Sequence, residues 1–451
     1  MSTTSATAAR TAQLTNLQAF RQAVYDRGLT QRRAAQFELV DALLLSGAIH
    51  SFAELSQSPA FRRTWHSAYA ALADGRQDEA WLRAFLVQQL PQQGRVMLAG
   101  DATAWPRPRS PTLPDRQYCH SPTPAVGRAS VVVGQPYAVV SWVAEPGSSW
   151  ALPLDLARIP SAQTASQFAA TQIRRLNAAR APSDAALWLV ALDGAYGNVK
   201  FWQELPPGDR YGVVTRLRRD RVLYQAPEPY GGRGRPRKHG PRFAFRDPTT
   251  WGAPQEEPTF ADPEWGTVTL RAWANLHDRA AADQPFGLVR AIVHEERPTP
   301  PEALWLSWHG PPQPAEVVWR AYGARWSVEP SIAVRKQQLH WTQPAVQTLG
   351  AMAIWTGLVS VAMWMLWLAR GRVADCPLPW QRAQPAKTPG RVAAGWAGLF
   401  AEVGTPAAAP RRRGKAPGWP QGRVRRRKGR SRVVKKGPPQ VRAPTNGQKA
   451  A

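Results

Sequence analysis

Cysteine is nearly absent from this sequence, whose 451 residues include only Cys119 and Cys376. Two cysteines support neither a disulfide framework nor a Cys-based zinc site. Disulfide-rich secreted proteins and Cys-ligated zinc proteins are therefore excluded as classes. A reducing cytoplasm fits this composition.

Acidic residues are also scarce. Asp and Glu total 31 against 58 Lys and Arg, which gives a net charge of +27 and an isoelectric point near 11.2. Such a balance implies a polyanionic partner, most often nucleic acid. Ribosomal proteins and proteins of membrane surfaces are the competing explanations.

The C-terminal part has no acidic residue at all after Glu402, whereas fifteen Lys and Arg follow it, in runs such as RRRGK and VRRRKGRSRVVKK. Residues 373–451 are rich in Pro, Ala, Gly and Arg, with few apolar residues after Phe400. We predict a disordered basic tail that attracts DNA without sequence preference and in a salt-sensitive way.

Long apolar runs are absent with one exception, Leu349–Ala369, which has 21 residues and no charge. This length is sufficient for a membrane-spanning helix, but a helix buried at the centre of a large domain has the same composition. Residues 1–13 are small and polar, without the apolar centre of a signal peptide, and we expect them to be disordered.

The spacing of apolar residues in the remaining sequence changes near Gly94. Residues 14–90 carry apolar residues at three- and four-residue spacing between Gly and polar turns, which predicts a small bundle of helices. Beyond Gly94, apolar runs bounded by Gly and Pro predict strands, with one amphipathic helix at TASQFAATQIRRLNAAR. The sequence therefore predicts a mixed α/β body preceded by a helical domain.

Two aspartates come at the ends of predicted strands. GRVMLAGDATAW predicts a strand that ends in Asp101, and the apolar strand from Ala186 to Leu192 ends in Asp193. Active sites of mixed α/β folds collect ligands at such places. A lone Asp at a strand end is also a common turn or cap residue, so position alone leaves both readings open.

A further polar cluster lies in the segment AEVVWRAYGARWSVEPSIAVRKQQLH. Tyr322, Arg325, Glu329 and Lys336 are separated by three, four and seven residues, so on one helix all four project from one stripe. The stripe is either a polar working face or a solvated surface with ordinary ion pairs. Pro330 removes a backbone donor, so we expect the helix to kink or restart beside Glu329.

These four residues fit YxxRxxxExxxxxxK, and the segment thereby resembles the region around the last acid of a large group of bacterial insertion-sequence DDE transposases. The resemblance implies an α/β fold with a ribonuclease H-like mixed sheet, whose adjacent first and fourth strands bring Asp101 and Asp193 together. It also implies a β-rich insertion before Glu329. The helix Leu349–Ala369 is then expected to pack against the catalytic sheet instead of spanning a membrane.

The resemblance also divides the chain. In this family a small helical domain precedes the catalytic domain and helps to hold the transposon ends. The expected order is disordered residues 1–13, a helical DNA-binding domain at 14–90, the first part of the catalytic domain at 94–220, the β-rich insertion at 221–310, the second part of the catalytic domain at 311–372 and the disordered basic tail at 373–451.

The site follows from the same resemblance. Asp101, Asp193 and Glu329 are expected to be the catalytic acids and to hold two Mg²⁺ or Mn²⁺ ions, because hard cations prefer oxygen ligands. Cations suited to phosphates and aromatic rings suited to stacking are expected to contact the DNA. These are Tyr322, Arg325, Trp326 and Lys336.

The insertion contains a second candidate DNA contact, GGRGRPRKHG, in which Arg233 and Arg235 belong to an RGRP core. This core resembles the AT-hook, whose extended Arg-Gly-Arg enters narrow minor grooves. A flexible loop that contacts phosphates has the same composition and remains the alternative.

The resemblance implies a cut-and-paste transposase that cleaves DNA at transposon ends in a metal-dependent reaction and joins those ends to target DNA. Its partner is double-stranded DNA, on which it acts as a dimer, in the bacterial cytoplasm at the nucleoid and without a membrane. A catalytically decayed or architectural DNA-binding protein is the alternative, and a nuclease without strand transfer is closer still. Metal-dependent strand breakage separates an enzyme from a passive binder.

Overall fold

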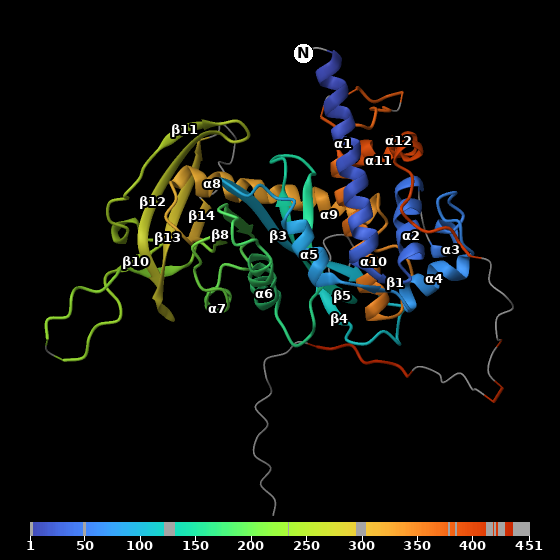
Figure 1. Ribbon diagram of the computed structural model, residues 1–451. Helices are drawn as coiled ribbons and strands as arrows, with labels where there is room; N and C mark the ends of the chain where they lie inside the picture. Colours follow the sequence, from blue (N-terminus) through green and yellow to red (C-terminus); the bar gives the residue numbers. More distant parts are fainter. Residues whose placement is uncertain are drawn as a thin grey trace, which may run out of the picture.

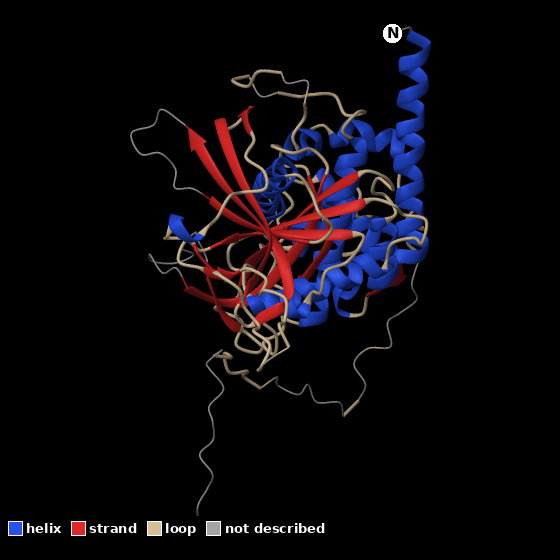
Figure 2. Ribbon diagram, turned by 90° about the vertical axis from the view of Figure 1, so that its left-hand side faces the viewer, coloured by secondary structure: helices blue, strands red, loops and turns tan. Residues whose placement is uncertain are grey.

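The computed structural model of the chain describes residues 3–47, 51–120, 131–232, 234–294, 304–377, 379–383, 386–411, 418, 421–422 and 429–435. Helices from both ends of the sequence gather on one side of the molecule, and a large sheet extends away from them (Figure 1). The strands are splayed when seen from the side, as the twist of a wide sheet requires (Figure 2).

The region before the sheet is mainly helical, as predicted. It consists of α1 (Thr3–Ala23), α2 (Arg33–Leu45), α3 (Phe52–Leu55), α4 (Trp65–Ala73), α5 (Glu79–Val87) and a hairpin of β1 (Leu29–Gln31) and β2 (Arg76–Gln77). Because α1 begins at Thr3, residues 3–13 are helical and not disordered as we expected. The alanines of this segment are strong helix formers, and they offset its lack of an apolar face.

The apolar helix α10 (Leu349–Ala369) lies at the centre of this helical layer. It packs against α1, α2, α4 and strand β6, and one core cluster contains side chains from all of them. Within the described residues α10 is the one helix long and apolar enough to cross a membrane, yet 72% of its most apolar stretch is buried. The helix thus forms part of the protein core.

A buried ion pair, Arg21 to Asp41 at 2.7 Å, joins α1 to α2 next to this core. Burial is the largest influence on Asp41 and raises its pKa, although Arg21 opposes the shift. Arg21 also donates to the carbonyl of Gly404 at 2.7 Å, so the pair connects the N-terminal helices to the residue that follows α12 (Trp396–Val403).

The predicted mixed α/β architecture is confirmed. Within the described residues one sheet contains 12 strands, and its order runs β10-β9-β12-β13-β14-β8-β7-β3-β5-β4, with β11 paired to β12 and β6 paired to β5. The strands of the first part are β3 (Arg95–Pro106), β4 (Gln117–His120), β5 (Val131–Val143), β6 (Ala151–Arg158), β7 (Leu187–Leu192) and β8 (Tyr211–Leu217).

The strands β3, β7 and β8 run parallel, whereas β5 pairs antiparallel with both β3 and β6. Strand β7 is apolar throughout because both of its faces are covered. Its residues Trp188, Val190 and Leu192 join the core beside α6 (Ala165–Ala178), while Leu189 and Ala191 join a second cluster beneath α8.

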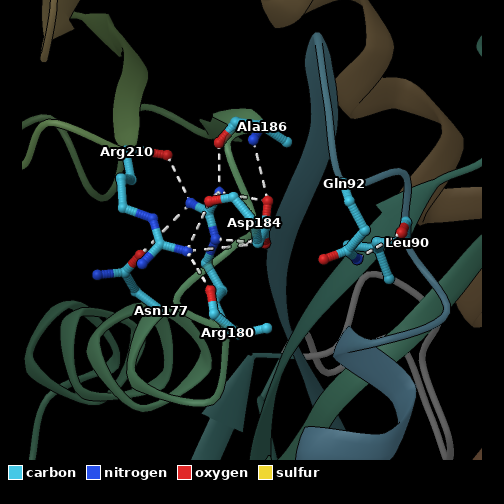
Figure 3. A network of polar contacts seen from close by, with 8 residues as sticks. Leu90, Gln92, Asn177, Arg180, Asp184, Ala186 and Arg210 are labelled. Carbon is cyan, nitrogen blue, oxygen red and sulfur yellow. Dashed lines mark hydrogen bonds and ion pairs between the residues drawn. The ribbon is translucent and has the colours of Figure 1, made fainter.

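A buried polar network fixes the beginning of β7 (Figure 3). Arg180 donates to the Asp184 carboxylate at 2.6 and 2.8 Å and to the Arg210 carbonyl at 2.7 Å, while the carboxylate also accepts from the Ala186 amide at 2.9 Å. Burial alone would raise the pKa of Asp184, but the hydrogen bonds from Arg180 and Ala186 outweigh it and lower the pKa. The network ties the starts of β7 and β8 together.

The predicted insertion is β-rich and continues the same sheet beyond β8. Its strands are β9 (Val222–Tyr224), β10 (Arg242–Ala244), β11 (Thr259–Asp262), β12 (Gly266–Asp278), β13 (Ala281–His294) and β14 (Leu304–His309). β14 pairs with residues 213–217 of β8, so the added strands extend the sheet directly from β8. The remaining helices near the sheet lie outside the insertion: α7 (Val199–Glu204) precedes it, and α8 (Ala315–Ala324) and α9 (Val328–Gln337) follow it.

The prediction that residues 373–451 form a disordered tail is wrong for the first part of that range. Residues 389–403 form α11 (Pro389–Ala394) and α12 (Trp396–Val403), and the side chains of Val392 and Trp396 are completely buried. These helices contact α10, α1 and α2. Composition over the whole tail obscured four apolar residues, Val392, Trp396, Leu399 and Val403, whose spacing is helical.

Candidate active site

The two candidate aspartates meet because of strand register. Strands β3 and β7 pair in parallel, and their last paired residues are Ala99 and Ala191. Asp101 and Asp193 each come two residues after this pair in the sequence. Asp193 follows the last residue of β7, as expected. Asp101, expected at the end of its strand, lies within β3, which continues to Pro106 in pairing with β5.

Backbone amides orient the two carboxylates. The Asp193 carboxylate accepts from the Ala195 amide at 2.9 Å, in a turn that includes Gly194. The Asp101 carboxylate accepts from the Ala102 amide at 2.7 Å. Each carboxylate has further acceptor positions beyond this one hydrogen bond.

Glu329 reaches the same region from the opposite direction in sequence. The helix restarts as predicted: α8 ends at Ala324, a 3₁₀ turn covers Arg325–Ser327, and α9 begins at Val328. Pro330 lies in the first turn of α9, where an absent amide hydrogen costs nothing. Glu329 is thus at the junction, and its carboxylate pairs with Arg325 at 3.0 Å.

Two cavities meet at these three acids. Asp101, Asp193 and Glu329 line both of them. The first has a volume of about 790 Å³ and extends toward the insertion. The second has a volume of about 720 Å³ and extends toward β4 and the C-terminal half of α9. A bound chain that ran from one cavity to the other would pass over the carboxylates.

The first cavity contains five arginines beside four carboxylates, those of Asp101, Asp193, Asp220 and Glu329. It is lined by Tyr322, Arg325, Arg216, Arg218, Arg219 and Arg246. The sequence analysis did not identify the last four, although RLRR comes directly at the end of a predicted strand, the position that had drawn attention to Asp193. Arg246 belongs to the insertion. It reaches this cavity through the pairing of strands distant in sequence, which no local sequence pattern predicts.

The second cavity contains Lys336. Its ammonium donates to the Thr103 hydroxyl at 2.6 Å and so joins α9 to β3. Burial lowers the pKa of Lys336, with a smaller contribution from Arg335. Tyr118 and His120 of β4 line the same cavity and were also not identified from the sequence.

Two further predicted DNA contacts, Trp326 and Arg235, line neither cavity. The Trp326 ring is 50% exposed on the 3₁₀ turn and lines neither cavity. Arg235 is exposed in the loop between β9 and β10, and Arg233 lies outside the described residues. The AT-hook resemblance thus stays a prediction.

The electrostatics of the acids suit a cation. Burial raises the pKa of Asp101 to about 6, and the nearby Asp193 and Glu329 carboxylates add to the shift. Among the described residues no three Asp, Glu, His or Cys side chains are grouped closely enough to hold a metal ion. The oxygen-only donor set nevertheless fits Mg²⁺ or Mn²⁺, provided that Glu329 turns away from Arg325.

Asp101 within β3 and Asp193 directly after the adjacent parallel strand β7 lie between cavities lined with cations, and this arrangement defines a class of site suited to phosphate diesters. A family model described as DDE superfamily endonuclease matches residues 24–276, which is more than half of the chain, and the chain belongs to this family. The match includes Asp101 and Asp193 and ends before Glu329. The predicted DDE relationship is thereby confirmed.

Solved structures similar to this one include the piggyBac transposase in a synaptic complex with hairpin DNA. The identity is 10% and the TM-score 0.40, over 84% of this chain and 73% of that chain. No curated protein matches the sequence.

Proposed function

We propose that this DDE endonuclease is a transposase, which cleaves double-stranded DNA at transposon ends and transfers the ends into target DNA. The observation that carries the proposal is the convergence of Asp101, Asp193 and Glu329 on the boundary of two cavities. The YxxRxxxExxxxxxK residues surround that boundary. The family match covers the positions of the two aspartates, and the motif and its geometry extend the proposal to Glu329.

The fold part of the proposal is a ribonuclease H-like arrangement. The partial strand order β6-β5-β3-β7-β8, with the first three antiparallel and the last three parallel, supports it. The insertion follows β8, and the last acid returns on α9 after it. The catalytic domain would then consist of two sequence segments separated by the insertion.

The three acids would hold two Mg²⁺ or Mn²⁺ ions. When bound, such ions lower the pKa of the attacking hydroxyl or water and stabilise the leaving 3′-oxygen of an in-line displacement at phosphorus. The role of the chain is to position oxygen ligands on a rigid sheet. Asp101 and Asp193 are fixed by β3 and β7, while Glu329 is on a helix whose start is set by the 3₁₀ turn.

The cations would bind the DNA backbone. If Glu329 held a metal ion, its ion pair with Arg325 would be lost, and the Arg325 guanidinium would then be available for a phosphate. Arg216, Arg218 and Arg246 would hold the DNA in the first cavity, and Lys336 in the second. A dimer on DNA, a bacterial nucleoid location and the absence of a membrane partner belong to the same proposal.

The alternative is a decayed copy that binds DNA without breaking it. The ion pair between Arg325 and Glu329 favours this alternative to the extent that it keeps the third acid away from the other two. Strand breakage is the property that decides between the two functions.

The test uses a plasmid that carries the gene with its native flanks, incubated with purified protein and Mg²⁺ or Mn²⁺. We expect metal-dependent breaks at two defined positions, and Glu329→Gln should reduce them on the order of 10³-fold. Glu316→Gln, the same change at an exposed ion pair on α8, is the matched control and should cleave like wild type.

Binding without breaks by the wild type would contradict the transposase and support the decayed alternative. A readout independent of activity is the thermal shift caused by Mg²⁺. It should appear in wild type and in Glu316→Gln, and it should shrink in Glu329→Gln if this acid is a metal ligand.

A further inference from the structure

The edge of the sheet beside the second cavity is formed by β4, the last strand in the order. This strand has four residues, and one of its edges is taken by β5. The other edge presents backbone groups that can pair with another extended segment. Tyr118 of β4 lines the second cavity and is 51% exposed.

A segment of the basic tail occupies this edge. The Val434 amide donates to the Arg116 carbonyl at 2.7 Å, and Val434 forms a parallel bridge with Gln117. Upstream, the Ser431 amide donates to the Pro111 carbonyl at 2.8 Å, and the Arg116 guanidinium donates to the Ser431 carbonyl at 3.1 Å. Figure 1 shows this red segment passing beneath β4.

The segment brings free positive charge to the cavity. Arg430, Arg432 and Lys435 are exposed, and none of them has an ion pair among the described residues. Lys435 and Val434 line a hollow of about 320 Å³ together with Gln117 and Tyr118. Because Gln117 and Tyr118 also line the second cavity, the hollow continues the path that begins at the carboxylates.

We propose that residues 429–435 form a DNA clamp, in which pairing to β4 holds three cations against the phosphates of the strand that leaves the second cavity. Tyr118 would lie under the sugar or base of that strand. The proposal rests on the proposed function, since it takes DNA as the occupant of the cavity. Pairing through backbone hydrogen bonds needs no burial of apolar side chains, which explains how so polar a segment can dock on β4.

The test compares two proline variants. Val434→Pro removes the amide that donates to Arg116, whereas Val433→Pro places the same residue at a neighbouring position whose amide makes no backbone bond among the described residues. A third variant, Arg430→Ala/Arg432→Ala/Lys435→Ala, keeps the pairing and removes the charges. All three are made in the Glu329→Gln protein, so that binding is measured without cleavage.

The measurement is the affinity for a fluorescent duplex from the flanks of the gene, over a range of salt concentrations. Affinity falls as salt rises, and we expect the triple variant to make the slope of log affinity against log salt less steep by about two to three, since each phosphate contact contributes roughly 0.9. Val434→Pro should reduce the steepness by a similar amount and weaken binding about tenfold at moderate salt. Val433→Pro should behave like the parent.

Equal affinities and slopes for Val434→Pro and its parent would overturn the clamp. Val434→Pro in the otherwise wild-type protein provides the second readout. Faster cleavage by that variant would also overturn the proposal, because it would identify the segment as an inhibitory strap. Failure of the proposed function has a different signature, since a protein that never cuts DNA can still show the clamp in the binding assay.

Discussion

The Asp101 carboxyl is subject to two unfavourable influences, burial and the proximity of Asp193 and Glu329, which raise its pKa from 3.8 to about 6. Since the folded-state pKa exceeds the unfolded value, ionisation of this group costs the folded state free energy. The stability associated with neutral Asp101 is complete below about pH 4 and is lost as the pH rises through 6.

Asp101→Asn should therefore stabilise the metal-free protein at neutral pH. We expect the free energy of unfolding to rise by about 2 kcal/mol near pH 7.5 and to change little near pH 4, where the wild-type carboxyl is also mostly neutral. Chemical unfolding in the presence of a chelator measures both values. The asparagine keeps an oxygen that can accept from the Ala102 amide, so the hydrogen bond within β3 is preserved.

The matched control is Asp209→Asn, the same change at an exposed position. It should alter stability at neither pH. A stabilisation by Asp101→Asn that is as large at pH 4 as at pH 7.5 would show that the effect does not come from the charge. Mg²⁺ should narrow the difference at pH 7.5, because a cation at the site stabilises the ionised wild-type carboxylate.

Single residues were predictable where a local pattern contained them. Asp193 follows an apolar strand, and Tyr322, Arg325, Glu329 and Lys336 have the spacing of a helical stripe. Thr103, which accepts from Lys336, and Arg246, in the first cavity, had no such pattern. Their positions depend on tertiary packing alone.

Among the elements, α10 connects the helical layer to the sheet. Trp364 is completely buried, and its indole donates to the Pro153 carbonyl of β6 at 2.8 Å. Its ring also stacks with Trp142 of β5 and with Phe20 of α1. The Trp364 side chain thus links α10 to β5, β6 and α1, each of which is distant from α10 in sequence.

Trp364→Phe should destabilise the protein by about 2 kcal/mol, because it removes the hydrogen bond to a buried carbonyl and leaves a small cavity. Urea unfolding followed by circular dichroism measures the change. Trp380→Phe is the control, since Trp380 is 79% exposed and its replacement should have almost no effect. Similar losses for both variants would mean that α10 does not depend on this contact.

The length and composition of α10 were readable from the sequence, but its surroundings were not. An uncharged run of 21 residues is compatible with lipid and with a protein core. What distinguishes the two is the set of partners, and residues such as Phe20 lie more than three hundred positions away in sequence. The break between α8 and α9 was predictable, since Pro330 has a local steric effect.

At the scale of the whole molecule, the segment after α12 folds against the N-terminal helical region. Arg62 donates to the Ala407 carbonyl at 2.6 Å, Arg63 to the Ala408 carbonyl at 2.6 Å, and the Ala408 amide donates to the Tyr25 hydroxyl at 3.2 Å. The sequence predicted the mixed sheet and its β-rich insertion because strand patterns are local. It placed the start of the tail too early because basic composition masked a short apolar repeat.

Two truncations test where the folded molecule ends. A chain that stops after Ala374, near the predicted start of the tail, loses α11 and α12 and exposes the core that Val392 and Trp396 cover. We expect it to lose at least about 3 kcal/mol of stability, or to aggregate, because two large apolar side chains no longer contribute their burial. A chain that stops after Pro410 keeps these helices and the contacts of Ala407 and Ala408.

The longer truncated chain should thus unfold at the same urea concentration as the full protein while it binds DNA more weakly, with a reduced salt dependence. Unfolding and DNA titrations on both chains separate the structural part of the tail from its electrostatic part. If the chain ending at Ala374 were as stable as the full protein, α11 and α12 would not belong to the core, and the compositional prediction of a wholly disordered tail would stand.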